Sequence, residues 1–166
     1  MASSITLYNH TALRIADATG ILLSTGTFKL SLHTSTYTPS GAHAVYADLT
    51  NEISTAGGYT TGGVTLDSVT LGTVTTNDVK FDAADEVLTA TAGDIDAWRY
   101  AVLRRSDTVN SLVGPLIGYI IGNTTGPTDI PATTVGNTLT FTFNASGIIT
   151  GTVTLSWPYL PHNPQR

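Results

Sequence analysis

Few residues in this 166-residue chain are of the types that do chemistry, and they do not fall into the spacings that chemistry requires. The histidines stand far apart, at His10, His33, His43 and His162, with no H-x-x-x-H or H-E-x-x-H pair to hold a zinc ion. The chain has no cysteine and therefore no thiolate nucleophile, disulfide or Cys-ligated metal. No serine occupies a G-x-S-x-G turn. We therefore expect a protein that is not an enzyme, with no catalytic, cofactor-binding or metal-binding site.

The acidic residues are the one group for which a ligand can be argued. Half of the 12 aspartates and glutamates fall within one short segment, at Asp78, Asp82, Asp85, Glu86, Asp94 and Asp96. Carboxylate oxygens suit Ca²⁺, and two carboxylates about 5 to 10 Å apart can act as the acid and base of a glycosidase. The segment lacks the D-x-D-x-D-G spacing of an EF-hand loop, and a sequence does not fix a separation in space. A solvated turn is the favoured interpretation, and cation binding by residues 78–96 stays open.

Two further motifs are similar to ligand sites but lack the residues that define them. The segment 57–63, Gly-Gly-Tyr-Thr-Thr-Gly-Gly, has no P-loop lysine, and a strand pattern follows it instead of a helix. We expect it to be a flexible connection. The basic pair Arg104-Arg105 is expected at a strand end, where it would meet acidic residues of a partner subunit.

The composition excludes several classes of partner. Charged residues make up 11% of the chain and the net charge is -5, whereas about 25% is usual for a soluble domain. A weakly acidic chain with one basic pair has no surface that would attract nucleic acid or anionic lipid. The longest apolar stretch, Leu112 to Ile121, is about half of the roughly 20 residues that a bilayer requires, and Met1–Ser4 lacks the basic start of a secretory signal. We expect no nucleic-acid or membrane partner and no export.

Hydrophobic periodicity predicts one helix, close to the start of the chain. Apolar residues recur there at three- and four-residue steps, and Gly20 stands where a helix would stop. The pattern predicts a short amphipathic helix from about Leu7 to Ala18.

From Thr27 onward the period changes to two, which is typical of β-strands. Phe28, Leu30 and Leu32 alternate with polar residues, which predicts a strand with one buried and one wet face. A change of parity at Asp67-Ser68 predicts a bulge or a break. Further strands are expected at 64–71, 79–81, 98–102, 116–121, 139–143 and 153–157. The last two flank a turn at Asn144–Gly147, and we expect them to form a hairpin.

These patterns predict an all-β protein: a single β-sandwich or jelly-roll-like domain of about 7–8 strands, with a short N-terminal helix and an extended C-terminal arm. Residues 1–20 would be the helical segment packed on the domain, 21–157 the sandwich, and 158–166 the proline-rich arm. Trp157, Tyr159 and Leu160 are candidates for contact with a neighbouring subunit, as are Arg104 and Arg105. Closure of the end of the domain is the alternative role for the aromatic and apolar residues of the arm.

Three segments carry a resemblance to a known family. They are Phe28–Pro39, Tyr46–Ile53 with the sequence Tyr-Ala-Asp-Leu-Thr-Asn-Glu-Ile, and Gly58–Leu66. Together with Arg99–Val102, Pro115–Ile120 and the Phe141–Leu155 region, they resemble, in composition and order, a family of small β-rich virion proteins of tailed bacteriophages. The resemblance covers most of Leu7 to Trp157, and the C-terminal arm lies outside it.

The resemblance implies a structural part of a virion, without a catalytic site to carry over. We expect a capsid decoration or cement protein that binds the major capsid protein, assembles as a homo-oligomer, with a trimer favoured, and resides in the virion after assembly in the host cytoplasm. A tail, neck or fibre-base component is the first alternative. A host-surface carbohydrate-binding module is the second, and it predicts acids and aromatics that converge in one groove.

Overall fold

The computed structural model describes residues 5–16, 21, 23–75, 78–123 and 125–152. Its helical elements are α1 (Asn9–Ala16) and the short 3-10 helix η1 (Tyr46–Asp48). Its strands are β1 (Thr6–Leu7), β2 (Phe28–His33), β3 (Val64–Thr65), β4 (Thr70–Thr75), β5 (Asp78–Asp82), β6 (Glu86–Thr89), β7 (Tyr100–Arg105), β8 (Thr108–Val109), β9 (Leu112–Val113), β10 (Leu116–Ile121), β11 (Thr138–Phe141) and β12 (Ile149–Thr152). The expected helix is confirmed over Asn9–Ala16.

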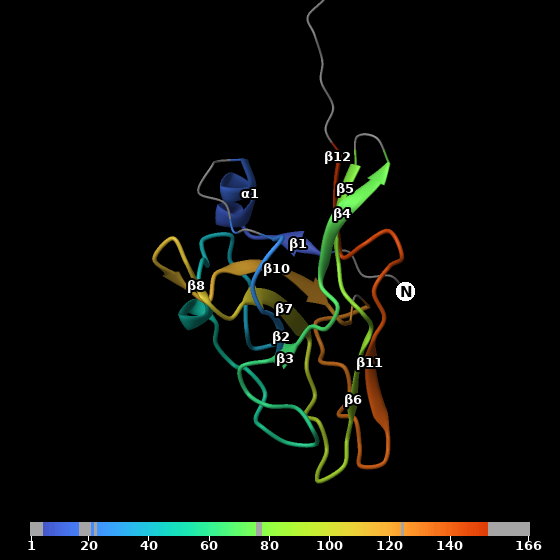
Figure 1. The fold of residues 1–166 in the computed structure, drawn as a ribbon. Coiled ribbons are helices and arrows are strands. Elements are labelled where there is room, and N and C mark those ends of the chain that lie inside the picture. Colours follow the sequence, from blue (N-terminus) through green and yellow to red (C-terminus); the bar gives the residue numbers. More distant parts are fainter. Residues whose placement is uncertain (1–4, 17–20, 22, 76–77, 124, 153–166) are drawn as a thin grey trace, which may run out of the picture.

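A five-stranded antiparallel sheet forms the centre of the fold, in the order β1-β10-β7-β2-β3 (Figure 1). Every residue of β2 is paired with β7, from Phe28 opposite Arg105 to His33 opposite Tyr100. The edge strand β1 lies within residues 1–20, the segment predicted to be helical. Thr6 and Leu7 pair with Tyr119 and Gly118 of β10, so the chain joins the sheet before it enters α1.

Both faces of this sheet are covered, and this corrects the predicted wet face of β2. Ser31 and His33, expected to face solvent, are fully buried. The main core lies on one face and includes Phe28, Leu30 and Leu32. A smaller core of Tyr8, Tyr37, Val102 and Leu116 lies on the other. The polar members of β2 are therefore packed under side chains that come from distant parts of the chain.

Two smaller antiparallel sheets pack against the main core. β12, β5 and β4 form one, and β11 and β6 form the other (Figure 1). Phe81 of β5 meets Phe28 of β2 with ring centroids 4.8 Å apart, in an edge-to-face arrangement that aromatic pairs favour. The predicted parity break is confirmed, because β3 ends at Thr65, β4 begins at Thr70, and Ser68 between them has a φ of 51°.

The second strand of the predicted hairpin, 153–157, lies outside the described residues, and the described strands on the two sides of Asn144–Gly147 do not pair with each other. The turn itself is present, since the Gly147 N–H donates to the Asn144 carbonyl at 2.7 Å. However, β11 pairs with β6 and β12 pairs with β5, so the strands on the two sides of the turn belong to different sheets. Their partners lie about 60 residues earlier in the chain, a distance that local patterning does not encode.

The fold is thus mostly β, with several antiparallel sheets and a short helix near the N-terminus, and the described strands do not close into a sandwich or jelly roll. The described helices are all too short and too polar to cross a bilayer.

Candidate functional site

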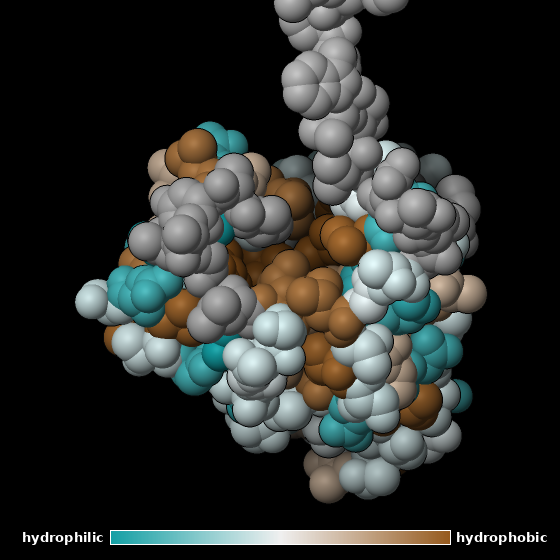
Figure 2. All heavy atoms as spheres, turned by 45° about the horizontal axis from the view of Figure 1, so that its top comes forward, coloured by the Kyte–Doolittle hydropathy of each residue, from teal (hydrophilic) through white to brown (hydrophobic). Residues whose placement is uncertain are grey.

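A cavity of about 770 Å³ lies where the central sheet meets the chain around β11 and β12. Leu7 of β1 and Ile120 of β10 line one side, and Leu139, Phe141 and Ile149 line the other. A hollow bounded by hydrophobic residues opens on the molecular surface between α1 and the sheet of β4, β5 and β12 (Figure 2). The apolar side chains that pack around the cavity are only partly buried, because no further layer of described residues covers them.

Trp98 is the largest residue in the wall of this cavity. Its side chain is 4% exposed and packs against Phe141, with ring centroids 5.4 Å apart. The backbone of Trp98 is held by two hydrogen bonds with Ile130, of 3.3 Å and 2.7 Å. Its indole Nε1 is buried and has no hydrogen-bond partner among the described residues. Buried donors are nearly always paired in folded proteins, so this N–H is an exception among the described residues.

The alternation of β11 places aromatic side chains in the same wall. Leu139 and Phe141 are half-buried, whereas Thr138 and Thr140 are exposed, and Phe143 continues the pattern beyond the strand. Gly122 borders the indole of Trp98 so closely that a Cβ atom there would lie 2.7 Å from its Cζ3 atom. A strand-ending glycine and an alternating strand therefore shape the space around one tryptophan.

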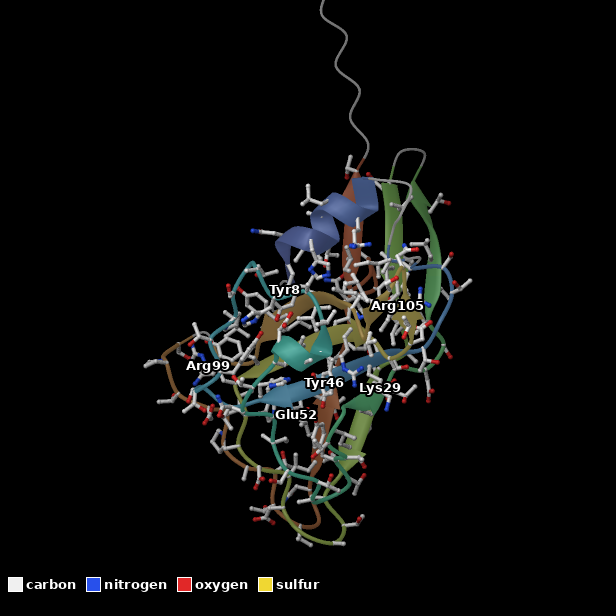
Figure 3. All side chains as sticks on the ribbon, turned by 90° about the vertical axis from the view of Figure 1, so that its left-hand side faces the viewer. Tyr8, Lys29, Tyr46, Glu52, Arg99 and Arg105 are labelled. Atoms are coloured by element: carbon white, nitrogen blue, oxygen red, sulfur yellow. The ribbon has the colours of Figure 1, made fainter. Side chains whose placement is uncertain are left out.

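A second cluster gathers around Glu52, on the loop between η1 and β3. The hydroxyl of Tyr46 donates to Oε2 of Glu52, and that of Tyr59 donates to Oε1 at 2.5 Å. The Gly62 N–H donates to Oε1 at 2.7 Å. Tyr46 and Glu52 lie together in front of the central sheet (Figure 3). Burial, followed by the Glu52 hydrogen bond, raises the pKa of Tyr46 to about 12, so the cluster stays protonated at its phenols.

A third cluster joins α1 to the rest of the fold. The hydroxyls of Tyr8 and Tyr37 lie 2.9 Å apart, and Tyr37 in turn lies 3.0 Å from Nδ1 of His43. The Nδ1–H of His10 donates to the His43 carbonyl at 3.1 Å, while its Nε2 atom is buried without a partner among the described residues. Burial is the main cause that raises the pKa of Tyr8 and lowers that of His10. The hydrogen bonds of this cluster hold the start of α1 against the rest of the fold.

Comparison with known proteins identifies no relative of this chain. None of the protein-family models, curated proteins or solved structures matches the chain. The function proposed below is therefore argued from the residues of this chain and from the resemblance given above.

Arg104 and Arg105, predicted as a partner-contact pair, are buried and make their described contacts inside the chain. Arg105 donates to Asp107 through Nε at 2.8 Å and to the Ile21 carbonyl at 2.7 Å. The guanidinium of Arg104 lies 4.0 Å from the centre of the Tyr46 ring. The acid that meets Arg105 is thus a neighbour in sequence, and a subunit contact for the pair remains a prediction. The other candidates, Trp157, Tyr159 and Leu160, lie outside the described residues.

The acidic segment does not converge on a common point. The side chain of Glu86 is buried and accepts from the Asp67 N–H at 2.8 Å. Asp85 accepts from the Phe143 N–H at 2.9 Å, and Asp94 accepts from the Val135 N–H at 2.8 Å. No group of three metal-ligating side chains occurs in the part of the chain that the structure describes. These carboxylates fasten loops to one another, and residues 83–85 connect β5 to β6 at the place where a turn was expected.

The glycine-rich segment is a defined pair of turns where a flexible connection was expected. Ala56 and Tyr59 bond to each other through both backbone groups, at 3.1 Å and 2.9 Å. A Cβ atom at Gly57 would lie 2.7 Å from the backbone of residues 93–95. The glycines are needed here because two chain segments approach closely, and the backbone N–H of Gly62 is already bound to Glu52.

One described pair has the atoms of a nucleophile and its base but lacks access. Ser31 and His33 are both fully buried, with Oγ and Nε2 3.0 Å apart. The Nδ1–H of His33 donates to the Thr50 carbonyl at 2.8 Å, which leaves Nε2 to accept from Ser31. A substrate cannot reach this pair without unfolding the core, so the pair is structural.

The site that sequence reasoning missed is the cavity beside Trp98. The alternation at 139–143 was visible, but Trp98 and Phe141 are far apart in sequence, and only the tertiary fold shows that they share a wall. The signal available in the sequence is that two predicted strands, 98–102 and 139–143, each contain two aromatic residues.

Proposed function

We propose that this chain is a non-enzymatic structural protein of a tailed-bacteriophage virion that binds the outer head shell as a decoration or cement protein. The resemblance of the segment from Leu7 to Trp157 supplies the class of particle. The observation that carries the proposal is the contrast between polar and apolar groups. The polar side chains best suited to chemistry, such as Glu52 and His33, are engaged inside the chain, whereas no described residue covers the apolar side chains of the cavity wall.

The arrangement of the sheets supports a protein whose function is to bind other protein subunits. β11 has β6 on one side and no strand on the other among the described residues, and β4 and β12 are also edges. Unpaired strand edges are templates for a further strand unless something covers them. Low charge reduces the desolvation that such contacts require. The proposal includes a sandwich-like layering, in which the small sheets cover the central sheet through the core shared by Phe28 and Phe81.

Assembly would stabilise the protein by mass action, because a neighbour that binds only the folded chain favours it over the unfolded one. The proposal therefore includes a homo-oligomer, with a trimer as the first expectation, attached to the major capsid protein. It places the chain in the finished virion after assembly in the host cytoplasm.

Binding to undecorated capsids tests this role. The full chain is added to capsids that lack it, and the particles are imaged by cryo-electron microscopy. The expected result is new density at every equivalent lattice position, with saturation at hundreds of copies. Empty lattice positions would contradict the cement role, and density on the neck or tail with a dozen copies or fewer would support the tail alternative.

Two exposed apolar residues on different elements provide matched variants for the same experiment. Leu13 on α1 is 70% exposed and Val113 on β9 is 67% exposed. Leu13→Lys and Val113→Lys each replace an exposed apolar side chain by lysine and add the same charge. If one face contacts the shell, the variant on that face loses occupancy and the other serves as its control.

A further inference from the structure

The wall of the cavity combines aromatic rings with one unused hydrogen-bond donor. Trp98 and Phe141 supply flat apolar surfaces, and the buried Nε1–H of Trp98 has no acceptor among the described residues. Aromatic-lined grooves of this kind bind proline-rich peptides in the polyproline II conformation, whose carbonyls point outward and lack internal partners. An indole N–H beside such a peptide would gain the acceptor that it lacks.

The chain itself contains a segment with this chemistry. Residues 157–161 read Trp-Pro-Tyr-Leu-Pro, which places two prolines three residues apart in a P-x-x-P pattern. Between Trp157 and Pro161 there is no charged residue, so the segment can enter an apolar cavity without stripping water from an ion. Proline also limits the conformational entropy that binding would cost.

The last described strand, β12, runs away from the cavity toward its end at Thr152. β12 begins at Ile149, opposite Phe81 in the core, and ends at Thr152, opposite Asp78 at the far end of β5 (Figure 1). Ile149 and Thr150 line the cavity, so the chain is leading away from it as it reaches Thr152. Residues 153–157, Val-Thr-Leu-Ser-Trp, contain no glycine, proline, asparagine or aspartate to reverse the direction.

We propose that the cavity beside Trp98 binds the P-x-x-P segment Trp157–Pro161 of a second copy of this chain, with the Nε1–H of Trp98 donating to a backbone carbonyl of that segment. Each chain then contributes its segment to the cavity of a neighbour and receives the segment of a neighbour in its own cavity. It extends the proposed function, which calls for a homo-oligomer, but it does not depend on the virion role, because both partners are parts of the same chain.

Self-association of the full chain is the first test. The arm variant Tyr159→Ser/Leu160→Ser removes the apolar anchors, and Leu13→Ser removes an exposed leucine outside the cavity as the matched control. In sedimentation equilibrium we expect wild type and Leu13→Ser to associate alike and the arm variant to associate at least about thirtyfold more weakly, as for loss of a hot-spot residue. A wild-type chain that stays monomeric up to its solubility limit, or an arm variant that associates like wild type, would overturn the proposal.

Direct binding of the segment is the second test, and it does not depend on oligomer size. The receptor is the full chain carrying Trp157→Phe, Tyr159→Ser and Leu160→Ser, in which Trp98 is the one remaining tryptophan of the two. The ligand is an unlabelled synthetic peptide of residues 153–166. In ¹⁵N-labelled receptor we expect the single indole N–H signal to move downfield and saturate. The same peptide with Pro158→Ala and Pro161→Ala should bind at least about tenfold more weakly, because it is no longer preorganised.

The outcomes of the peptide titration are decisive in both directions. An indole signal that does not move, or equal binding of the alanine peptide, would overturn the assignment. A monomeric wild-type chain whose Trp98 signal already matches the peptide-bound position would show that the arm occupies its own cavity, and this also overturns the second-copy proposal. Neither test uses a capsid, so failure here leaves the virion proposal standing, and failure on capsids leaves this one standing.

Discussion

The phenol of Tyr59 bridges Glu52 and the central sheet. Its hydroxyl donates to Oε1 of Glu52 at 2.5 Å and accepts from the Leu32 N–H of β2 at 3.0 Å. Tyr59 is fully buried, and burial followed by the Glu52 bond raises its pKa. The loop that contains Glu52 is thus fixed to the sheet by one hydroxyl whose donor and acceptor functions are both used, in addition to the Tyr46 and Gly62 bonds.

Replacing Glu52 by Gln should therefore destabilise the fold. The glutamine oxygen can keep the bonds from Tyr59 and Gly62, and its NH2 group then faces the Tyr46 hydroxyl, so the bond from Tyr46 to a charged acceptor, worth about 2 kcal/mol, is lost or reversed. We expect the free energy of unfolding in urea to fall by about that amount. Asp96→Asn, at an exposed position, is the control for loss of charge and should stay within about 0.5 kcal/mol. Equal stability of both variants would contradict the bridging role.

The turn that ends at Gly63 should tolerate no side chain. Its φ is 92°, and a Cβ atom would lie 2.8 Å from the Leu30 carbonyl oxygen. Gly136 has a similar φ of 87° with nothing within 4 Å, and Gly72 has free space without the positive φ. We expect Gly72→Ala to be nearly neutral, Gly136→Ala to cost about 1–2 kcal/mol of backbone strain, and Gly63→Ala to cost several kcal/mol. Thermal unfolding of the three variants separates the cost of backbone strain from the cost of the steric clash with Leu30. An equal loss of stability in Gly63→Ala and Gly136→Ala would contradict a contribution from that clash.

Local patterns predicted α1 and most of the longer strands but missed β1, β6, β8 and β9, and they predicted the contacts between distant elements poorly. The alternation of Phe28, Leu30 and Leu32 identified β2, because one buried face is enough to produce a period of two. The same pattern gave the wrong environment for Ser31 and His33, because the second core is built by Tyr8, Tyr37 and Leu116 from three separate segments. Of these three residues only Tyr37 lies near β2 in sequence, so the residues around β2 do not predict that its second face is buried.

The site was harder to predict for the same physical reason. A cavity is the space left between elements, and its wall here comes from β1, from Trp98 just before β7, from β10 and from the region of β11 and β12. Trp98 and Phe141 each fit an ordinary strand pattern, and their pairing depends on the tertiary arrangement of two sheets. In the acidic segment, Asp85, Glu86 and Asp94 each accept from a different backbone N–H, a use that spacing alone does not reveal.

The buried phenols should make the protein unfold cooperatively at high pH. Burial raises the pKa of Tyr8, Tyr46 and Tyr59 above 10.0, and that of Tyr46 reaches about 12. An acid whose pKa is higher in the folded state contributes stability that is fully present below the unfolded value of about 10 and is lost as the pH rises. We expect the absorbance of ionised tyrosine to rise in two phases, with the second coinciding with loss of the circular dichroism of the fold. A single phase that precedes unfolding would contradict the burial of these phenols.

Acid should destabilise the fold through His33. Burial lowers the pKa of His33 below 6.5, although the Thr50 carbonyl acts in the other direction. A base whose pKa is lower in the folded state binds more protons when unfolded, so its contribution is complete above the unfolded pKa of about 6.5 and is lost as the pH falls through the folded value. We expect the free energy of unfolding to decrease from about pH 6.5 downward. His33→Gln should flatten this slope while lowering stability at pH 8, because the amide cannot reproduce the ring packing against Tyr37 at 5.0 Å. A His33 ring signal that titrates at or above 6.5 in the folded protein would contradict this prediction.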